Sequence, residues 1–289
     1  MALRLLGPLL LASLLIACGP AEPPEPEGPT PRPVPDRPEP VDPEAGLREA
    51  VRTAMAGAHR SAVNQARDDQ RNPEETLAFL GLQRSHRAIE IWPGAGWYTE
   101  ILAPVLRDHG QLIVANGQQA LMDKFEADPG VYDQLEVVRF APPDEARLGE
   151  EGSADFVLLS RHFHNLAARG LEDVVLGAAY DVLRSGGILG IIQHRLPDDR
   201  EFDLEERTGY VPESFVIEAA ERAGFELADS SEVNANPLDT ADHELGVWTL
   251  PPTFRACADI DDEAELAECR ERYEAIGESD RMTLRFVKP

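Results

Sequence analysis

Short apolar runs alternating with amphipathic helical stretches constrain the fold of this chain more than any other feature. The predicted strands read "RAIEIW", "QLIVAN", "QLEVVRF", "ADFVLLS" and "ILGIIQH". Between them lie helical stretches such as "WYTEILAPVLRDHG", residues 119–127 and "LEDVVLGAAYDVLRSGG". Strands that alternate with helices pair in parallel through right-handed crossovers. We therefore predict an α/β fold, a doubly wound and mostly parallel sheet with helices on both faces.

Further elements flank this alternation. A helical stretch begins at Gly46, and a second helix begins with Asn72 as N-cap and Pro73 in its first turn. After the fifth strand, "VPESFVIEAAERAGFELADSSEV" predicts a helix and a sixth strand, and "MTLRFVK" predicts a seventh. We expect one domain at 47–289, with N-terminal helices at 47–84 and an insertion at 236–280 before the last strand.

The first residues resemble an export signal. Arg4 precedes an apolar run from Leu5 to Ile16, and the run ends in Leu-Ile-Ala-Cys18, which matches the bacterial lipobox. We expect a signal peptide at 1–17 and a lipidated Cys18; an ordinary secretory signal is the alternative. Gly19, where Asp would retain the protein in the inner membrane, favours the outer membrane facing the periplasm. Residues 18–46 alternate proline with charge and predict an extended spacer.

Charge and cysteine content narrow the partners. The chain has 27 basic and 53 acidic residues, a net charge of -26, which repels nucleic acid. An anionic small substrate would need a local basic patch. Cys257 and Cys269 remain as a pair after Cys18, and in an oxidising compartment they predict a disulfide. The pattern predicts no metal site.

A glycine-containing turn follows the first strand of the alternation. "IEIWPGAGWYTE" places Glu90, Gly94 and Gly96 between that strand and the next helix. Glycine lets the backbone approach a ligand closely, and a helix N-terminus offers free N–H groups. Open α/β sheets bind ligands at the carboxyl ends of their strands. The turn therefore predicts a ligand site, with a plain tight turn as the alternative.

This turn resembles motif I of class I S-adenosylmethionine (SAM) methyltransferases, an acidic residue followed by three spaced glycines. Glu90, Gly94 and Gly96 match, and Trp92 replaces the first glycine. "LRSGGILGIIQHR" and "ESDRMTLRFVKP" are similar to the fifth strand and the reversed seventh strand of that superfamily. More narrowly, residues 50–289 resemble a bacterial family of predicted exported methyltransferases. The resemblance implies an antiparallel last strand and SAM as cofactor.

The resemblance also implies residue roles. Gly94 and Gly96 would approach the amino acid portion of SAM, with Glu90 organising the turn. Asn116, with Gln118 close by, stands where an acidic residue would hold the ribose. Asp144 would meet adenine, with a solvated loop residue as the alternative. The rim after the fourth strand, "SRHFHNLAARG", would supply a cofactor contact, Arg161, and three catalytic groups, His162, His164 and Asn165. The end of the fifth strand would supply a further catalytic group, His194.

Several polar residues have both a functional and a structural interpretation. Either histidine of the rim could act as a proton acceptor or pack structurally, and Arg195 could form a salt bridge. Loop residues could cover the pocket or belong to ordinary turns: Tyr210, Asn234, Asn236 and His243. Arg67, Asp68 and Arg71 could cover the cofactor site, bind an anionic group, or form a solvated helix face.

Two functions remain open at this point. One is a SAM-dependent methyltransferase that acts on a small molecule or an envelope component. The other is a binding or accessory lipoprotein that uses the same fold without catalysis. Export favours the second function, because SAM is made in the cytosol. Trp92 and Asn116, which depart from the nucleotide-binding pattern, favour it as well.

Overall fold

A sheet of eight strands forms the centre of the computed structural model, which describes residues 43–289. The expected signal peptide, Cys18 and almost all of the spacer lie outside these residues. The strands are β1 (Arg87–Ile91), β2 (Gln111–Ala115), β3 (Glu136–Val138), β4 (Ala154–Ser160), β5 (Leu183–Leu196), β6 (Val211–Pro212), β7 (Glu226–Ser231) and β8 (Arg281–Val287).

Seven of the strands follow the order β3-β2-β1-β4-β5-β8-β7, and the two-residue β6 pairs with β5 beside this path. Strands β1 to β5 are parallel, whereas β8 is antiparallel to both of its neighbours, β5 and β7. The predicted doubly wound sheet with a reversed last strand is confirmed, and the two-residue β6 adds an eighth strand to the seven that the sequence predicts. Its parallel strands place their carboxyl ends along one edge.

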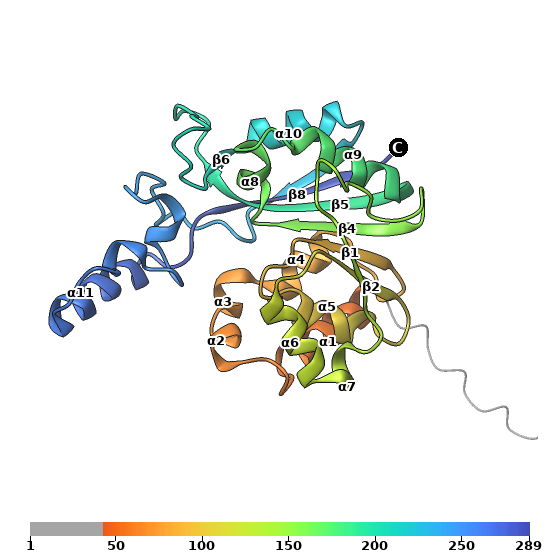
Figure 1. Ribbon diagram of the computed structural model, residues 1–289, viewed down its shortest axis with the longest axis horizontal. Helices are drawn as coiled ribbons and strands as arrows, with labels where there is room; N and C mark the ends of the chain where they lie inside the picture. Colours follow the sequence, from red (N-terminus) through yellow and green to blue (C-terminus); the bar gives the residue numbers. More distant parts are fainter. Residues whose placement is uncertain (1–42) are drawn as a thin grey trace, which may run out of the picture. The chain divides into compact units, whose positions relative to one another are not determined.

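Helices cover both faces of the sheet (Figure 1). One face carries α8 (Phe163–Ala167), α9 (Glu172–Val182) and α10 (Glu213–Arg222). The opposite face carries α1 (Pro43–Met55), α4 (Pro73–Phe79), α5 (Thr99–Leu106), α6 (Gln119–Ala127) and α7 (Pro129–Tyr132). The short α2 (Ala62–Gln65) and α3 (Asp68–Arg71) link α1 to α4. In the described part of the chain, no helix combines the length and apolar character needed to cross a membrane.

The core explains why the parallel strands read as continuous apolar runs. On β4, Val157 and Leu159 pack on the α9 face, while Phe156 and Leu158 pack on the α5 face. Successive side chains of a strand point to opposite faces, so the strands of a sheet covered on both sides are apolar at most positions. Apolar burial on both faces fixes the register, and with it the positions of the residues that follow each strand.

Three predicted elements differ from the observed ones. The long first helix ends at Met55 and resumes only as α2 and α3. Asn72 stands at the N-cap of α4, but its side chain donates to the Val233 carbonyl and makes no capping bond. The predicted helix ending at the paired glycines stops at Val182, because the next residues join the sheet; Gly186 N–H donates to the Lys288 carbonyl over 2.8 Å.

The insertion between β7 and β8 carries two 3-10 turns, η1 (Gly246–Thr249) and η2 (Arg255–Cys257), and helix α11 (Glu263–Glu274). A disulfide joins Cys257 to Cys269 with a Cα–Cα distance of 5.9 Å. Helix α11 buries none of its residues and extends away from the layered body (Figure 1). The disulfide therefore ties a segment that has little core of its own.

Candidate functional site

The carboxyl edge of the sheet concentrates unusual backbone geometry. The residues that follow β1, β2 and β4 are Trp92, Asn116 and Arg161, and their φ angles are 49°, 66° and 58°. Each donates its N–H to a carbonyl of the neighbouring strand, over 3.0, 3.0 and 2.6 Å. Left-handed backbone at non-glycine residues costs about 1–3 kcal/mol each and persists where surrounding structure enforces it. Such strain at one edge is typical of a functional site.

The glycine turn after β1 is built around a buried carboxyl. Glu90 is 2% exposed and accepts a hydrogen bond from the Thr99 hydroxyl over 2.6 Å. Burial raises the pKa of Glu90 to about 7. The two glycines differ: a Cβ on Gly94 would meet nothing within 4 Å, whereas one on Gly96 would lie 2.3 Å from Leu121. Gly94 therefore faces open space, and Gly96 allows α6 to pack closely.

A cavity of about 410 Å³, the Asn116 hollow, lies at the ends of β1 and β2. Its volume falls within the range of small-molecule sites, roughly 300–1,000 Å³. The Trp92 ring centroid is 6.1 Å from those of Phe140 and His162, so the indole forms a wall and leaves the space open. The lining consists of Trp92, Gly94, Asn116, Gln118, Phe140, Ala141, Pro142, His162, Asn165 and Arg169.

Two further cavities adjoin the Asn116 hollow. The Arg71 hollow, about 110 Å³, lies beside the glycine turn and is lined by Arg67, Arg71, Arg161 and Trp97 among others. The Trp248 hollow, about 340 Å³, is lined by Arg161, His164, His194 and the turn around Trp248. His162 lines all three cavities. This imidazole therefore stands where the hollows meet.

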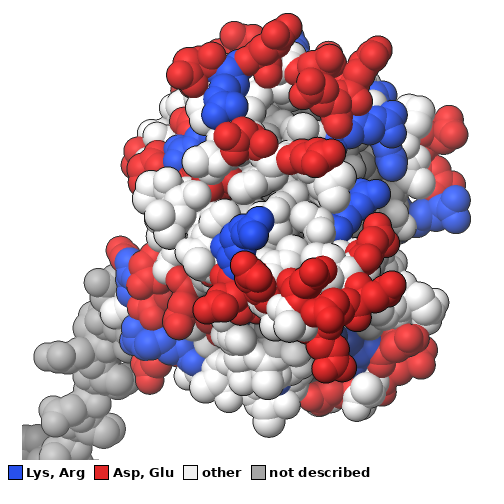
Figure 2. All heavy atoms as spheres, turned by 90° about the vertical axis from the view of Figure 1, so that its left-hand side faces the viewer, with Lys and Arg blue, Asp and Glu red and all other residues white. Residues whose placement is uncertain are grey.

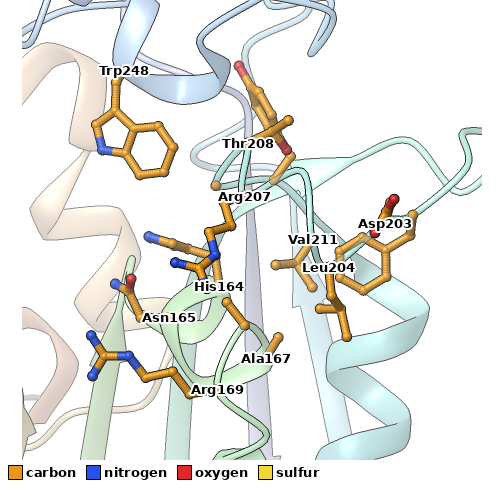
Figure 3. Close-up of a pocket in the computed structure, with 14 residues that line it drawn as sticks. His164, Asn165, Ala167, Arg169, Asp203, Leu204, Arg207, Thr208, Val211 and Trp248 are labelled. Atoms are coloured by element: carbon orange, nitrogen blue, oxygen red, sulfur yellow. The ribbon is translucent and has the colours of Figure 1, made fainter.

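A fourth pocket of about 150 Å³, the Arg207 pocket, is also lined by His164. Figure 3 shows the polar ends of Asn165, Arg169 and Arg207 pointing to the same side of this pocket, with the Trp248 indole above them. His164, Asn165 and Trp248 also line the Trp248 hollow, so the two spaces share a wall.

Three imidazoles gather at this edge in a neutral state. Burial lowers the pKa of His162 to about 4 and that of His164 to about 4, and it lowers the pKa of His194 well below its usual value. Their ring nitrogens lie within hydrogen-bonding distance of the Asn165, Gln193 and Ser279 side chains. At neutral pH all three rings are uncharged and can accept a hydrogen bond.

Arginines from distant segments converge on one carboxylate, Glu278, which is 4% exposed. Arg67, Arg71 and Arg281 donate to it over 2.6, 2.9 and 2.5 Å. Arg161 approaches to 4.0 Å. The guanidinium groups hold the pKa of Glu278 well below its usual range, whereas burial lowers the pKa of Arg161 to about 10. We call these four residues with Glu278 the arginine cluster.

Solved structures share this architecture at low sequence identity. The [4+2]-cyclase SpnF is 16% identical and superposes with a TM-score of 0.52, covering 84% of this chain and 93% of that chain. A geranyl diphosphate methyltransferase, solved in complex with SAM, is 11% identical with a TM-score of 0.50, covering 82% and 95%. No family model and no curated protein matches the sequence. The chain has the class I methyltransferase fold.

In this methyltransferase fold, most residues expected at the site do meet at the carboxyl edge. Those that line its hollows are Glu90, Gly94, Asn116, Gln118, Arg161, His162, His164, Asn165, His194, Arg67 and Arg71. Two lie elsewhere: Asp144 is exposed and lines none of these hollows, and Gly96 packs under α6. Ala141 and Pro142 form the wall that Asp144 was expected to supply.

Several loop residues make structural contacts. Arg195 pairs with Asp280 and Glu232, and Asp68 pairs with Arg60. The Asn234 amide donates hydrogen bonds to the Thr76 and Thr283 hydroxyls, and the Asn236 amide donates to the Ile276 and Glu278 carbonyls. The side chains of Tyr210 and His243 both bond to Asp239. Tyr210 additionally lines the Arg207 pocket. The contacts of Asn234, Asn236 and Arg195 hold the insertion against the start of β8.

The two histidines of the rim lie outside β4, at the start of the helix that follows it. β4 ends at Ser160, Arg161 turns the chain, and His162 precedes helix α8, which contains His164. The two imidazoles therefore do not share a strand face. In the described part of the chain, no group of three or more His, Cys, Asp or Glu residues is placed to hold a metal ion.

Sequence reasoning missed Gln193, Glu278 and Trp248. Gln193 is fully buried in β5, accepts from the Phe163 N–H and donates to the Gly209 carbonyl. A polar residue inside the apolar run "ILGIIQH" was the available signal. Glu278 and Trp248 belong to the insertion, and no local pattern indicates that this segment folds back over the carboxyl edge.

The neutral histidines predict a pH-dependent stability. Between about pH 6.5 and 4 these imidazoles are protonated in the unfolded chain but remain neutral in the folded protein, where they are buried. The free energy of unfolding therefore falls as pH is lowered through this window. Glu90, whose pKa is raised, acts in the opposite direction. His162→Asn should reduce the slope by up to about 1.4 kcal/mol per pH unit in urea titrations at pH 7, 6 and 5. His109→Asn, at an exposed position, is the control; equal slopes in both variants would contradict the assignment.

Proposed function

We propose that this protein is a SAM-dependent methyltransferase whose acceptor binds beside His162 and His164. The observation that carries the proposal is the Asn116 hollow, which is joined through His162 to a second cavity with neutral imidazoles. One space suits a nucleoside, and the other suits an acceptor. Low-identity fold neighbours support the fold, and the residues at the edge support the chemistry.

The residues present fit the cofactor at both ends. Gly94 leaves the backbone open beside the hollow, and Asn116 and Gln118 offer amide groups to a ribose. At the other end, Arg71 carries a buried guanidinium nitrogen that has no partner in residues 43–289 and suits the carboxylate of an amino acid. When bound, SAM supplies an electrophilic methyl group on a sulfonium.

The chain's own contribution is positioning and proton transfer. The edge around His162 holds acceptor and methyl donor in adjacent cavities, which favours an in-line displacement. His162 or His164, each neutral at pH 7, accepts the proton released by an oxygen or nitrogen acceptor. Trp92 and Trp248 narrow the cavities on either side and exclude water from the space between them.

Isothermal titration of the full chain with SAM and S-adenosylhomocysteine (SAH) tests this proposal. We expect saturable binding of both, and weaker binding of adenosine, which lacks the carboxylate that Arg71 would hold. Absence of binding at millimolar ligand would overturn the proposal.

The alternative function, a non-catalytic envelope binding protein, gains support from Trp92 at the first glycine position. Mass spectrometry of ligands that co-purify from the native envelope separates the two, because a non-nucleotide ligand favours the alternative.

We further propose that the protein acts on the cell envelope and that a lipid attached to Cys18 anchors it there. The lipobox at residues 15–18 and the proline-rich residues 19–46 support this location. Cys18→Ser should move the protein from the membrane fraction to the soluble periplasmic fraction of the expressing cell. Equal membrane association of both forms would contradict an anchor at Cys18.

A further inference from the structure

The arginine cluster carries more positive charge than the fold uses. Four guanidinium groups, from α3 and its preceding residue, the end of β4 and the start of β8, surround the single carboxylate of Glu278. An excess of three positive charges therefore remains at one place in a chain whose net charge is -26. Like charges held this close repel one another. Burial of Arg71 and Arg281 adds a desolvation cost, whereas Arg67 and Arg161 are 18% and 32% exposed.

Several donors of the cluster lack partners. Nη2 of Arg67, Nη2 of Arg71 and Nε of Arg281 are buried and make no hydrogen bond within residues 43–289. Arg71 and Arg281 are each only 3% exposed. The Arg161 guanidinium makes no hydrogen bond in the same part of the chain, and its nearest carboxylate oxygen is 4.0 Å away. Buried charged donors without acceptors are costly, so this arrangement suits anionic ligands.

The charge excess exceeds what one cofactor would balance. If SAM binds as proposed, its carboxylate neutralises one of the three excess charges, and its sulfonium and ammonium groups add positive charge. Arg67 and Arg161 line the Trp248 hollow as well as the Arg71 hollow, so they can face a second anion on the acceptor side. The Trp248 hollow is also lined by Glu278, whose charge is already counted in the excess, and by the neutral rings of His164 and His194.

We propose that the Trp248 hollow binds an anionic group of the methyl acceptor, a carboxylate or a phosphate, through Arg161 and Arg67. This inference rests on the proposed methyltransferase function. The planar guanidinium fork matches both oxyanions. The opposite wall of the hollow is apolar, formed by Val247, Trp248 and Pro251, and it packs against the uncharged body of the acceptor.

Acidic residues dominate the charge of the chain, with 53 acidic and 27 basic residues. Figure 2 shows acidic side chains over much of the face, with basic side chains standing among uncharged ones nearer its middle. Arg169 and Arg207 extend the basic character into the adjoining Arg207 pocket (Figure 3). The acidic surface repels anions in general. The local excess of arginine therefore favours an anionic group that is small enough to enter the Trp248 hollow.

Thermal unfolding of the full chain with inorganic phosphate and with succinate, at ionic strength fixed by sodium chloride, tests the site. We expect a saturable rise in Tm with at least one of them, and the anion with the lower Kd identifies the oxyanion class. Arg161→Gln should weaken that binding by about tenfold or more, and Arg161→Lys by less. Arg222→Gln, which removes an exposed pair with Asp173 on α9, should leave binding unchanged.

The ligand-free proteins provide a second readout. Because Arg161→Gln removes one of four mutually repelling charges, its Tm without anions should equal or exceed that of the wild type, so loss of binding cannot be ascribed to misfolding. No saturable effect beyond that of chloride would overturn the inference. So would equal anion binding by Arg161→Gln and the wild type.

Saturating SAH separates this inference from the proposed function. Anion binding that persists in the presence of SAH supports a distinct acceptor subsite. Anion binding that SAH abolishes competitively would overturn the inference, because the arginines would then serve only the carboxylate of the cofactor. Phosphate or succinate binding in a protein that does not bind SAH would support the anion site and overturn the methyltransferase proposal.

Discussion

Replacing Glu278 by Gln is expected to destabilise the domain by about 3–5 kcal/mol, the largest stability effect that this structure predicts for one isosteric change. The variant removes the only carboxylate among the arginine cluster and leaves four guanidinium groups facing one another. Glu278 joins α3 to the start of β8, so the variant loses ion pairs between segments that are about two hundred residues apart in the sequence. Urea unfolding at pH 7 measures the loss.

A matched control separates burial from simple charge removal. Glu232→Gln also breaks an arginine pair, at 2.6 Å from Arg195, but the Glu232 side chain is 69% exposed. Exposed pairs contribute about 0–1 kcal/mol, so this variant should remain close to the wild type. A loss of less than about 1 kcal/mol in Glu278→Gln would show that Glu278 does not hold the cluster together.

The position of Glu278 illustrates what sequence can and cannot predict. The alternation of strands and helices predicts the sheet, because apolar periodicity and the both-sided burial of parallel strands are local signals. The same logic places Gly94, Asn116 and His162 at one edge, since each follows a parallel strand. Glu278 precedes the reversed strand β8 and reaches that edge from the opposite chain direction. Only the tertiary pairing of β8 with β5 brings it there.

The sequence left the role of Arg67 and Arg71 open. Their helical stretch could cover the cofactor site, bind an anionic group or form a solvated face. Arg71 is nevertheless buried, with its guanidinium 4.6 Å from the centre of the Trp97 ring. No periodicity distinguishes an exposed arginine from one that lies against an aromatic ring under a loop. The basic patch that an anionic substrate would require is therefore a property of the fold, assembled from residues more than two hundred positions apart.

Substituting Gly94 by Leu should weaken SAH binding by two orders of magnitude or more in isothermal titration. Gly94 adopts φ +61°, and a Cβ there would point into open space beside the glycine turn. A leucine side chain would fill part of the Asn116 hollow and keep the backbone away from the ligand, which removes both contact and volume. The proposed function predicts this loss, since the turn is where the cofactor would approach most closely.

The chain offers a closely matched control for backbone strain. Gly170 has φ +60°, also has nothing within 4 Å of an added Cβ, and lines none of the three hollows where SAH or its acceptor would bind. Gly170→Leu should therefore lose a similar free energy of unfolding, about 1–2 kcal/mol for the left-handed backbone, while binding SAH like the wild type. If both variants bind SAH equally well, the ligand does not lie over Gly94. If both lose binding equally, strain rather than steric exclusion is responsible.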